Sequence, residues 1–168
     1  MMTPDLCQAF ARYNAWQNAS IYGAAATLSE AERRRDRGAF FGSIHATLSH
    51  LLWGDTVWMS RFDDWDRPEV GIAGSVDFEP DWARLVQRRG EADARIRDWA
   101  GRVTPEWFAG DRTWYSGVLG RDVTKPAGYC VAHFFNHQTH HRGQVHAMLT
   151  AAGARPGDTD LFAMPDDA

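Results

Sequence analysis

The sequence predicts an all-α protein: a four-helix bundle with one long crossover and a short β-hairpin or irregular insertion before the last helix. Two observations carry this prediction. In four long stretches, apolar residues recur at three- and four-residue intervals, as they do on the buried face of an amphipathic helix. The stretch before the last of these combines aromatic and β-branched residues with two glycines, which is typical of a hairpin.

The first two helices are predicted over residues 4–28 and 40–63. Thr3 is suited to cap the first helix, and Pro4 fits its first position because proline lacks the N–H that would be unpaired there. The second helix has one broad apolar sector. The following segment, DWDRPEVGIAGS, contains proline, glycine and acidic residues and is predicted to be a loop. The long crossover then lies between the second and third helices or between the third and fourth.

The third helix is expected from residue 80 or 81 to about residue 102, with a heavily charged outer face. Residues 104–125 hold the expected hairpin, and the last helix follows from Pro126 to about residue 152. We therefore expect residues 1–155 to form one helical-bundle domain and residues 156–168 to form a short acidic tail. Such bundles hold metals and ligands between facing helices.

The composition predicts a soluble, cytoplasmic protein that binds neither nucleic acid nor membranes. The formal net charge of the 168 residues is −4, so the excess of basic residues that favours anionic partners is missing. No apolar run approaches the roughly 20 residues that a membrane-spanning helix needs, and the N-terminus does not have the pattern of a signal peptide. The two cysteines, Cys7 and Cys130, have no disulfide-framework spacing and fit a reducing compartment.

Histidines provide the strongest functional signal in the chain. In the last predicted helix, His133, His137, His140 and His141 recur at three- and four-residue intervals, which places them on one side of a helix. Two imidazoles four residues apart on a helix are a common way to bind a divalent transition metal. Because no cysteine lies in this cluster, we expect nitrogen ligands, or nitrogen with oxygen and water, which suit Zn, Ni, Cu or Fe.

A third ligand can come from the second predicted helix, which contains His45 and His50. These two residues are five positions apart, so they lie about 140° apart around the helix and cannot both reach one ion. Each flanks the apolar sector on an opposite edge. The periodicity alone does not choose between them.

Two charged residues occupy positions where the helical pattern requires apolar ones. Arg142 lies within the apolar stripe of the last helix, and Asp55 lies centrally in the apolar sector of the second. A buried charge without a partner is very costly, so we predict a buried ion pair between Asp55 and Arg142. The alternative is that Arg142 reaches the surface along Phe135.

The segment NHQTHHRGQ, the upstream pattern H-x-x-x-x-H-L-L-W-x-D-x-x-W and the early Y-N-x-W-x-N together resemble the DinB-like family of damage-inducible, four-helix bacterial metalloproteins. The resemblance extends from about residue 5 to residue 152. It implies a divalent cation, commonly nickel or zinc, bound by His50, His137 and His141. The resemblance thus favours His50 over His45, and the pair 137/141 over the equally spaced pair 133/137.

Three imidazoles leave an open coordination position, which is the arrangement of a catalytic site. The DinB-like family is related to transferases and isomerases that use mycothiol or bacillithiol, so the resemblance implies a low-molecular-weight thiol as cosubstrate, and a homodimer. His133 and His140 are candidate catalytic residues, or else hydrogen-bonding side chains of a polar pocket. The alternatives are a metal-hydroxide hydrolase and a non-catalytic metal- or ligand-binding protein of the stress response. The ligand face of the last helix carries no carboxylate base, which disfavours the hydrolase.

Overall fold

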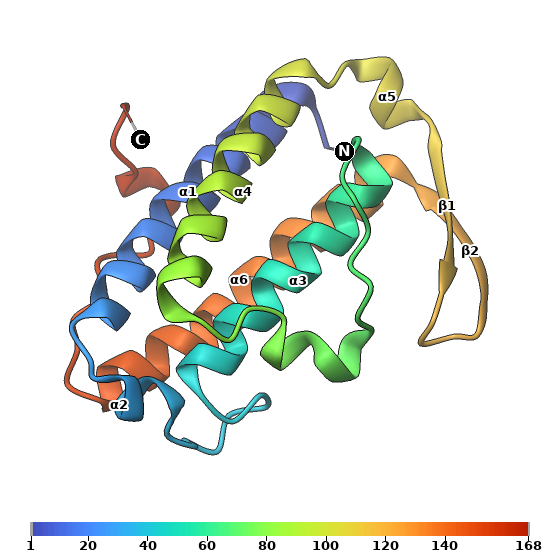
Figure 1. Ribbon diagram of the computed structural model, residues 1–168. Coiled ribbons are helices and arrows are strands. Elements are labelled where there is room, and N and C mark those ends of the chain that lie inside the picture. The colour runs from blue at the N-terminus through green and yellow to red at the C-terminus, as the bar shows by residue number, and fades with distance from the viewer. Residues whose placement is uncertain (1, 168) are drawn as a thin grey trace.

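Four long helices form the frame of the protein, whose computed structural model describes residues 2–167 (Figure 1). They are α1 (Pro4–Ala26), α3 (Ile44–Phe62), α4 (Trp82–Arg102) and α6 (Ala127–Ala151). The two shorter α-helices are α2 (Glu30–Arg34) and α5 (Pro105–Ala109), and two 3₁₀ turns cover Ile72–Asp77 (η1) and Leu161–Ala163 (η2). In Figure 1, α1 runs beside α4 and α3 runs beside α6. The predicted all-α bundle is confirmed.

Side-chain caps set where the long helices begin. The Thr3 hydroxyl accepts a hydrogen bond from the backbone N–H of Leu6, and Pro4 occupies the first helical position as predicted. The second predicted helix, expected from residue 40, begins at residue 44 instead. Its cap is Ser43, whose hydroxyl accepts from the N–H of Ala46, and the residues before it form a tight turn.

The interior is filled mainly by side chains from the four long helices. Trp99 of α4 stacks on Phe62 of α3, with ring centroids 5.5 Å apart, and Phe134 of α6 meets Phe62 edge-on at 5.9 Å. These aromatic contacts join three helices at one end of the bundle. The largest fully buried aliphatic side chains are Ile21, Ile44, Leu48, Leu51, Leu52, Met59, Leu85, Ile96 and Leu149.

The predicted hairpin is confirmed as an antiparallel pair, β1 (Asp111–Ser116) and β2 (Arg121–Pro126), which projects from the bundle between α5 and α6 (Figure 1). Its turn uses Gly120 at a φ of 64°, a left-handed conformation that glycine adopts without strain. The long crossover joins α3 to α4. It was expected to be a plain loop, but it contains η1, which packs against α3.

The C-terminal segment lies against α1. The Tyr13 hydroxyl donates to the carbonyl of Thr159 (2.6 Å), and the Gln17 side chain donates to the carbonyl of Asp158 (2.8 Å). Within residues 2–167, every helix is too short or too polar to span a bilayer.

Candidate metal centre

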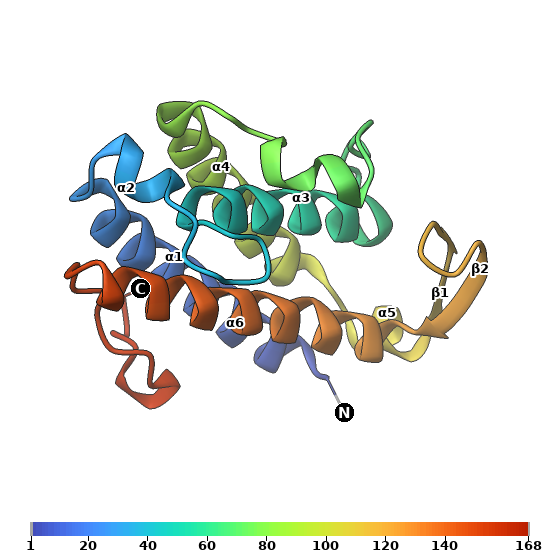
Figure 2. The same ribbon diagram turned by 90° about the horizontal axis from the view of Figure 1, so that it is seen from below.

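Helices α3 and α6 run side by side (Figure 2). Three imidazoles from these two helices come together. His50 comes from α3, and His137 and His141 come from α6. One nitrogen of each ring lies within 4.8 Å of the others, so this group can hold a metal ion. The two Nε2 atoms of His50 and His137 are 3.3 Å apart. Within the described residues, no other group of three or more His, Cys, Asp or Glu side chains has such an arrangement.

The structure groups the pair 137/141 rather than the pair 133/137. The ring centroids of His137 and His141 are 4.6 Å apart, and both rings lie about 5 Å from that of His50, at 5.3 and 4.9 Å. The ring of His133 is 6.0 Å from that of His137 and instead packs against Trp58 at 4.9 Å. The choice that the family resemblance implied therefore agrees with the geometry.

Hydrogen bonds fix which nitrogen of His50 carries the proton. The Ser75 hydroxyl in η1 lies 2.9 Å from Nδ1 of His50 and donates its own proton to the carbonyl of Ile72 at 2.7 Å. A hydroxyl has one proton, so toward His50 it acts as an acceptor, and Nδ1 of His50 is the donor. The lone pair of the ring is then on Nε2, the atom that faces His137.

The same argument applies to His141. Its Nδ1 lies 2.8 Å from Oε1 of Gln144, an oxygen that only accepts hydrogen bonds. His141 is therefore protonated at Nδ1, and its Nε2 carries the lone pair. Partners of this kind orient the histidine ligands of metals and fix their tautomer. Ser75 and Gln144 thus prepare two of the three imidazoles to bind a cation.

Two neighbours fit closely around the imidazoles. Phe41, from the turn before α3, stacks on His50 with ring centroids 3.9 Å apart. Gly54, one turn beyond His50, faces His137. A methyl group at Gly54 would lie 3.0 Å from Cε1 of His137, closer than such atoms normally approach. The position therefore has room for a glycine, and a larger residue would displace the His137 ring.

All three imidazoles favour the neutral form, the one that binds metals. Burial, together with the nearby His141, lowers the pKa of His50 to about 4. Burial, with the neighbouring imidazoles, lowers the pKa of His137 to about 3. The pKa of His141 is lowered as well, chiefly by burial. At neutral pH the metal-free group is uncharged, so no proton has to leave before a cation binds.

The imidazoles line a cavity of about 490 Å³. Its walls include four aromatic rings, and His133, His140 and Arg61 also line it. The aromatic residues are Phe40, Phe41, Trp53 and Trp58. No aspartate or glutamate is among the described residues that line the cavity. A ligand of moderate size therefore has access to the imidazoles in apolar surroundings.

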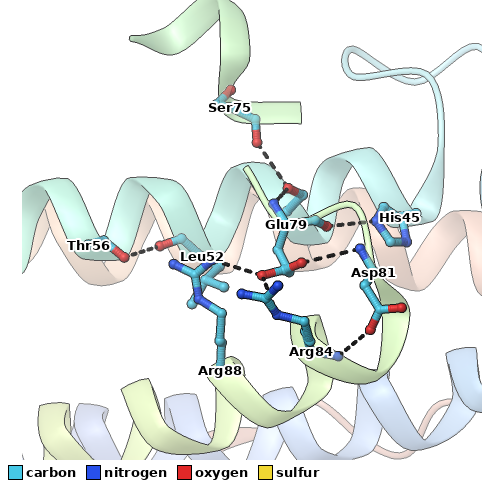
Figure 3. Close-up of polar contacts among 9 residues, drawn as sticks. His45, Leu52, Thr56, Ser75, Glu79, Asp81, Arg84 and Arg88 are labelled. Carbon is cyan, nitrogen blue, oxygen red and sulfur yellow. Dashed lines mark hydrogen bonds and ion pairs between the residues drawn. The ribbon is translucent and has the colours of Figure 1, made fainter. Parts of the chain in front are cut away.

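His45 belongs to a different cluster (Figure 3). Its Nε2 lies 3.0 Å from the backbone carbonyl of Glu79, and the ring is buried. The Glu79 carboxylate pairs with Arg88 at 3.0 Å and with Arg84 at 3.6 Å. His45 thus ties α3 to the segment before α4, and it lies outside the group of three imidazoles.

The ion pair predicted between Asp55 and Arg142 is wrong. Both side chains are buried, as expected, but Asp55 binds Arg89 of α4 at 2.5 Å, and Arg89 also binds Asp93 at 2.9 Å. Arg142 donates instead to the side-chain oxygens of Asn14 and Gln138. Arg89, from the predicted third helix, was not considered as a partner of Asp55.

The sequence pattern does indicate that Arg89 is buried. Arg89 follows Leu85 by four residues and precedes Ile96 by seven, so it falls on the buried face that these two residues define. Ser75, Gly54 and Phe41 were also missed as parts of the site. Each acts through a contact across the fold, and the local sequence pattern carries no sign of such contacts.

Comparisons with known proteins agree with this architecture. A family model described as "DinB family" matches residues 1–168. The chain is also similar to "Protein DinB" of Bacillus subtilis (strain 168), with 23% identity over 153 residues, which cover 88% of this chain and 87% of that protein. No solved structure matches the chain.

Proposed function

The chain belongs to the DinB family, and from this premise we propose that it is a metal-dependent transferase that joins a low-molecular-weight thiol to a small electrophile. One observation carries the proposal: the three imidazoles line an open cavity with apolar walls instead of being enclosed by protein ligands. A structural metal site is normally closed by four protein ligands, whereas a catalytic site keeps a position for the substrate.

His50, His137 and His141 are the proposed ligands, and Zn²⁺ or Ni²⁺ suits them best, with Fe and Cu as further candidates. The donor set fits: for tetrahedral zinc with Zn–N bonds of about 2.0–2.1 Å, two ligand nitrogens lie about 3.3 Å apart. The Nε2 atoms of His50 and His137 have this separation, 3.3 Å. A divalent ion held by these neutral imidazoles would keep its full charge and would lower the pKa of a bound thiol.

Side chains of the cavity would assist the proposed thiol transfer in two ways. The aromatic walls exclude water from the sulfur atom of the thiol. Without water, the interactions of this sulfur with charged groups are stronger. Burial, together with the nearby charge of Arg61, lowers the pKa of His133, so this cavity residue is neutral at pH 7 and able to accept the thiol proton. In the proposed reaction the S–H bond breaks, its proton passes to His133 and a new S–C bond forms. The displaced electron pair leaves with the leaving group, which then takes up a proton.

The lining of the cavity favours thiol transfer over hydrolysis. A metal-dependent hydrolase commonly places a carboxylate base beside the attacking water, and the described lining residues contain none. His140, the second candidate for proton transfer, is exposed like His133, but its Nε2 already contacts the Gln144 side chain at 3.4 Å, whereas the His133 ring packs against Trp58 in the cavity wall. We therefore rank His133 ahead of His140.

The test compares turnover of an electrophile, such as 1-chloro-2,4-dinitrobenzene, by protein loaded with Zn²⁺ or with Ni²⁺. Each preparation is assayed with cysteine, glutathione, mycothiol or bacillithiol, and without a thiol. We expect turnover that depends on the thiol, is lost in His141→Ala and persists in the control His146→Ala, which lies outside this cavity. Turnover without a thiol would favour the hydrolase. No turnover across a broad screen with fully metallated protein would favour a binding role.

A further inference from the structure

Arg61 and His50 lie on the same face of α3, about three helical turns apart. They are eleven residues apart, which is within about 20° of three full helical turns and about 16 Å along the axis. Both line the cavity. Side chains on a helix lean toward its N-terminus, so Arg61 extends back in the direction of the imidazoles. Its guanidinium carbon lies 4.4 Å from the ring centroid of Trp58, which supports this direction.

Arg61 differs from the other arginines that stack on tryptophan. Arg33, Arg95 and Arg112 each lie over an indole ring and donate at least one hydrogen bond to a backbone carbonyl. Arg61 lies between Trp58 and Trp114, at 4.4 and 5.0 Å, and within residues 2–167 it has neither an ion pair nor a hydrogen bond to protein. Its five N–H groups are thus available to a ligand.

The charge of Arg61 is not neutralised within the cavity. Burial, with the nearby Arg67, lowers the pKa of Arg61 to about 10, so the guanidinium stays charged at neutral pH. The described lining residues include five histidines and no carboxylate. A positive group in a cavity with apolar walls attracts anions more strongly than the same group on an open surface.

We propose that Arg61 binds a carboxylate of the substrate, while the reactive end of that molecule lies at His50, His137 and His141. The planar guanidinium matches a carboxylate through two parallel hydrogen bonds, and its stacking on Trp58 holds the plane in place. The aromatic walls then accommodate an apolar middle section. The inference rests on the proposed function, because it takes the cavity as the substrate site. It specifies the substrate class as a small, elongated carboxylic acid.

The first test uses Co²⁺-loaded protein and two series of thiols with matched chain lengths, ω-mercaptocarboxylates and ω-mercaptoalcohols. Thiolate binding to cobalt produces a charge-transfer absorption band, which gives the dissociation constant. At the best chain length we expect the carboxylate to bind at least tenfold more tightly than the alcohol. Arg61→Gln should remove this preference without changing the affinity for the alcohol, and Arg61→Lys should restore part of it. Arg95→Gln is the matched control, because Arg95 also stacks on a tryptophan but lies outside this cavity.

The second test needs neither metal nor thiol. Octanoate and octan-1-ol are titrated into the metal-free protein, and the fluorescence of Trp53 and Trp58 in the cavity wall reports binding. A preference for octanoate that Arg61→Gln removes supports the inference, even if no cobalt–thiolate band is found and the thiol proposal fails. A cobalt–thiolate band without a carboxylate preference overturns the inference and leaves the thiol proposal standing. If neither the band nor the preference for octanoate is observed, both are overturned.

Discussion

Ser75 holds the imidazole of His50 in place through a hydrogen bond. The Ser75 hydroxyl accepts from Nδ1 of His50 at 2.9 Å because its own proton is already donated to the carbonyl of Ile72. Both side chains are buried. The short 3₁₀ turn of the crossover, η1, therefore determines which nitrogen of a helical histidine faces the candidate metal centre.

Replacing Ser75 with alanine removes this acceptor, so the ring of His50 loses both its preferred tautomer and its orientation. We expect Ser75→Ala to weaken metal affinity about 10- to 100-fold, the usual effect of losing such a partner. Zn²⁺ affinity in competition with a chromophoric chelator measures it. Ser60→Ala is the control, since that hydroxyl bonds to the carbonyl of Val57, away from the imidazoles. Equal affinities for both variants would mean that Ser75 does not orient His50.

Replacing Gly54 with alanine should separate helix stability from metal binding. Alanine in a helix interior is favoured over glycine by about 0.5–1 kcal/mol, but here its methyl group would meet Cε1 of His137 at 3.0 Å. We expect Gly54→Ala to lose most of the metal affinity while the metal-free protein stays folded. In Gly90→Ala the new methyl group meets nothing within 4 Å, so metal affinity should be unchanged. Titration calorimetry with Zn²⁺ compares the two variants, and unchanged affinity in Gly54→Ala would contradict the close fit.

The buried ion pairs predict which arginine stabilises Asp55. Asp55 pairs with Arg89, so Arg89→Met leaves a buried carboxylate without its partner and should cost about 3–5 kcal/mol of unfolding free energy. In double-mutant cycles, followed by urea denaturation, Asp55 should couple more strongly to Arg89 than to Arg142. A larger coupling to Arg142 would instead restore the pairing expected from the sequence.

The lowered histidine pKa values predict how the stability of the metal-free protein depends on pH. Below about pH 6.5 the unfolded chain takes up a proton at His137, whereas the folded chain does not until about pH 3. The contribution of His137 to stability is therefore complete above pH 6.5 and is lost as the pH falls toward 3. Over the same range, His137→Gln should lose less stability than the unmodified protein. Parallel pH profiles from chemical denaturation would show that His137 does not titrate in this way.

The sequence predicted the features that depend on local periodicity. The four long helices and the hairpin follow from residue spacing, whereas the grouping of His50 with His137 and His141 was implied only by the family resemblance, because the spacing left His45 and the pair 133/137 open. Features that depend on contacts across the fold were missed or wrong. The second helix begins late because Ser43 caps it, and Asp55 pairs with Arg89 because a third helix brings that cation closer. The division into residues 1–155 and 156–168, the cytoplasmic location and the homodimer stay predictions.

Metal stoichiometry tests the central claim most directly. Metal-free protein is loaded with Zn²⁺, desalted and analysed for zinc per chain, alongside single variants of each proposed ligand. We predict one ion per chain, lost in His50→Ala, His137→Ala and His141→Ala, and retained in His45→Gln and His146→Ala. Full occupancy in the three ligand variants, or loss of zinc in His45→Gln alone while that variant remains folded, would contradict the assignment of His50, His137 and His141 as the metal ligands.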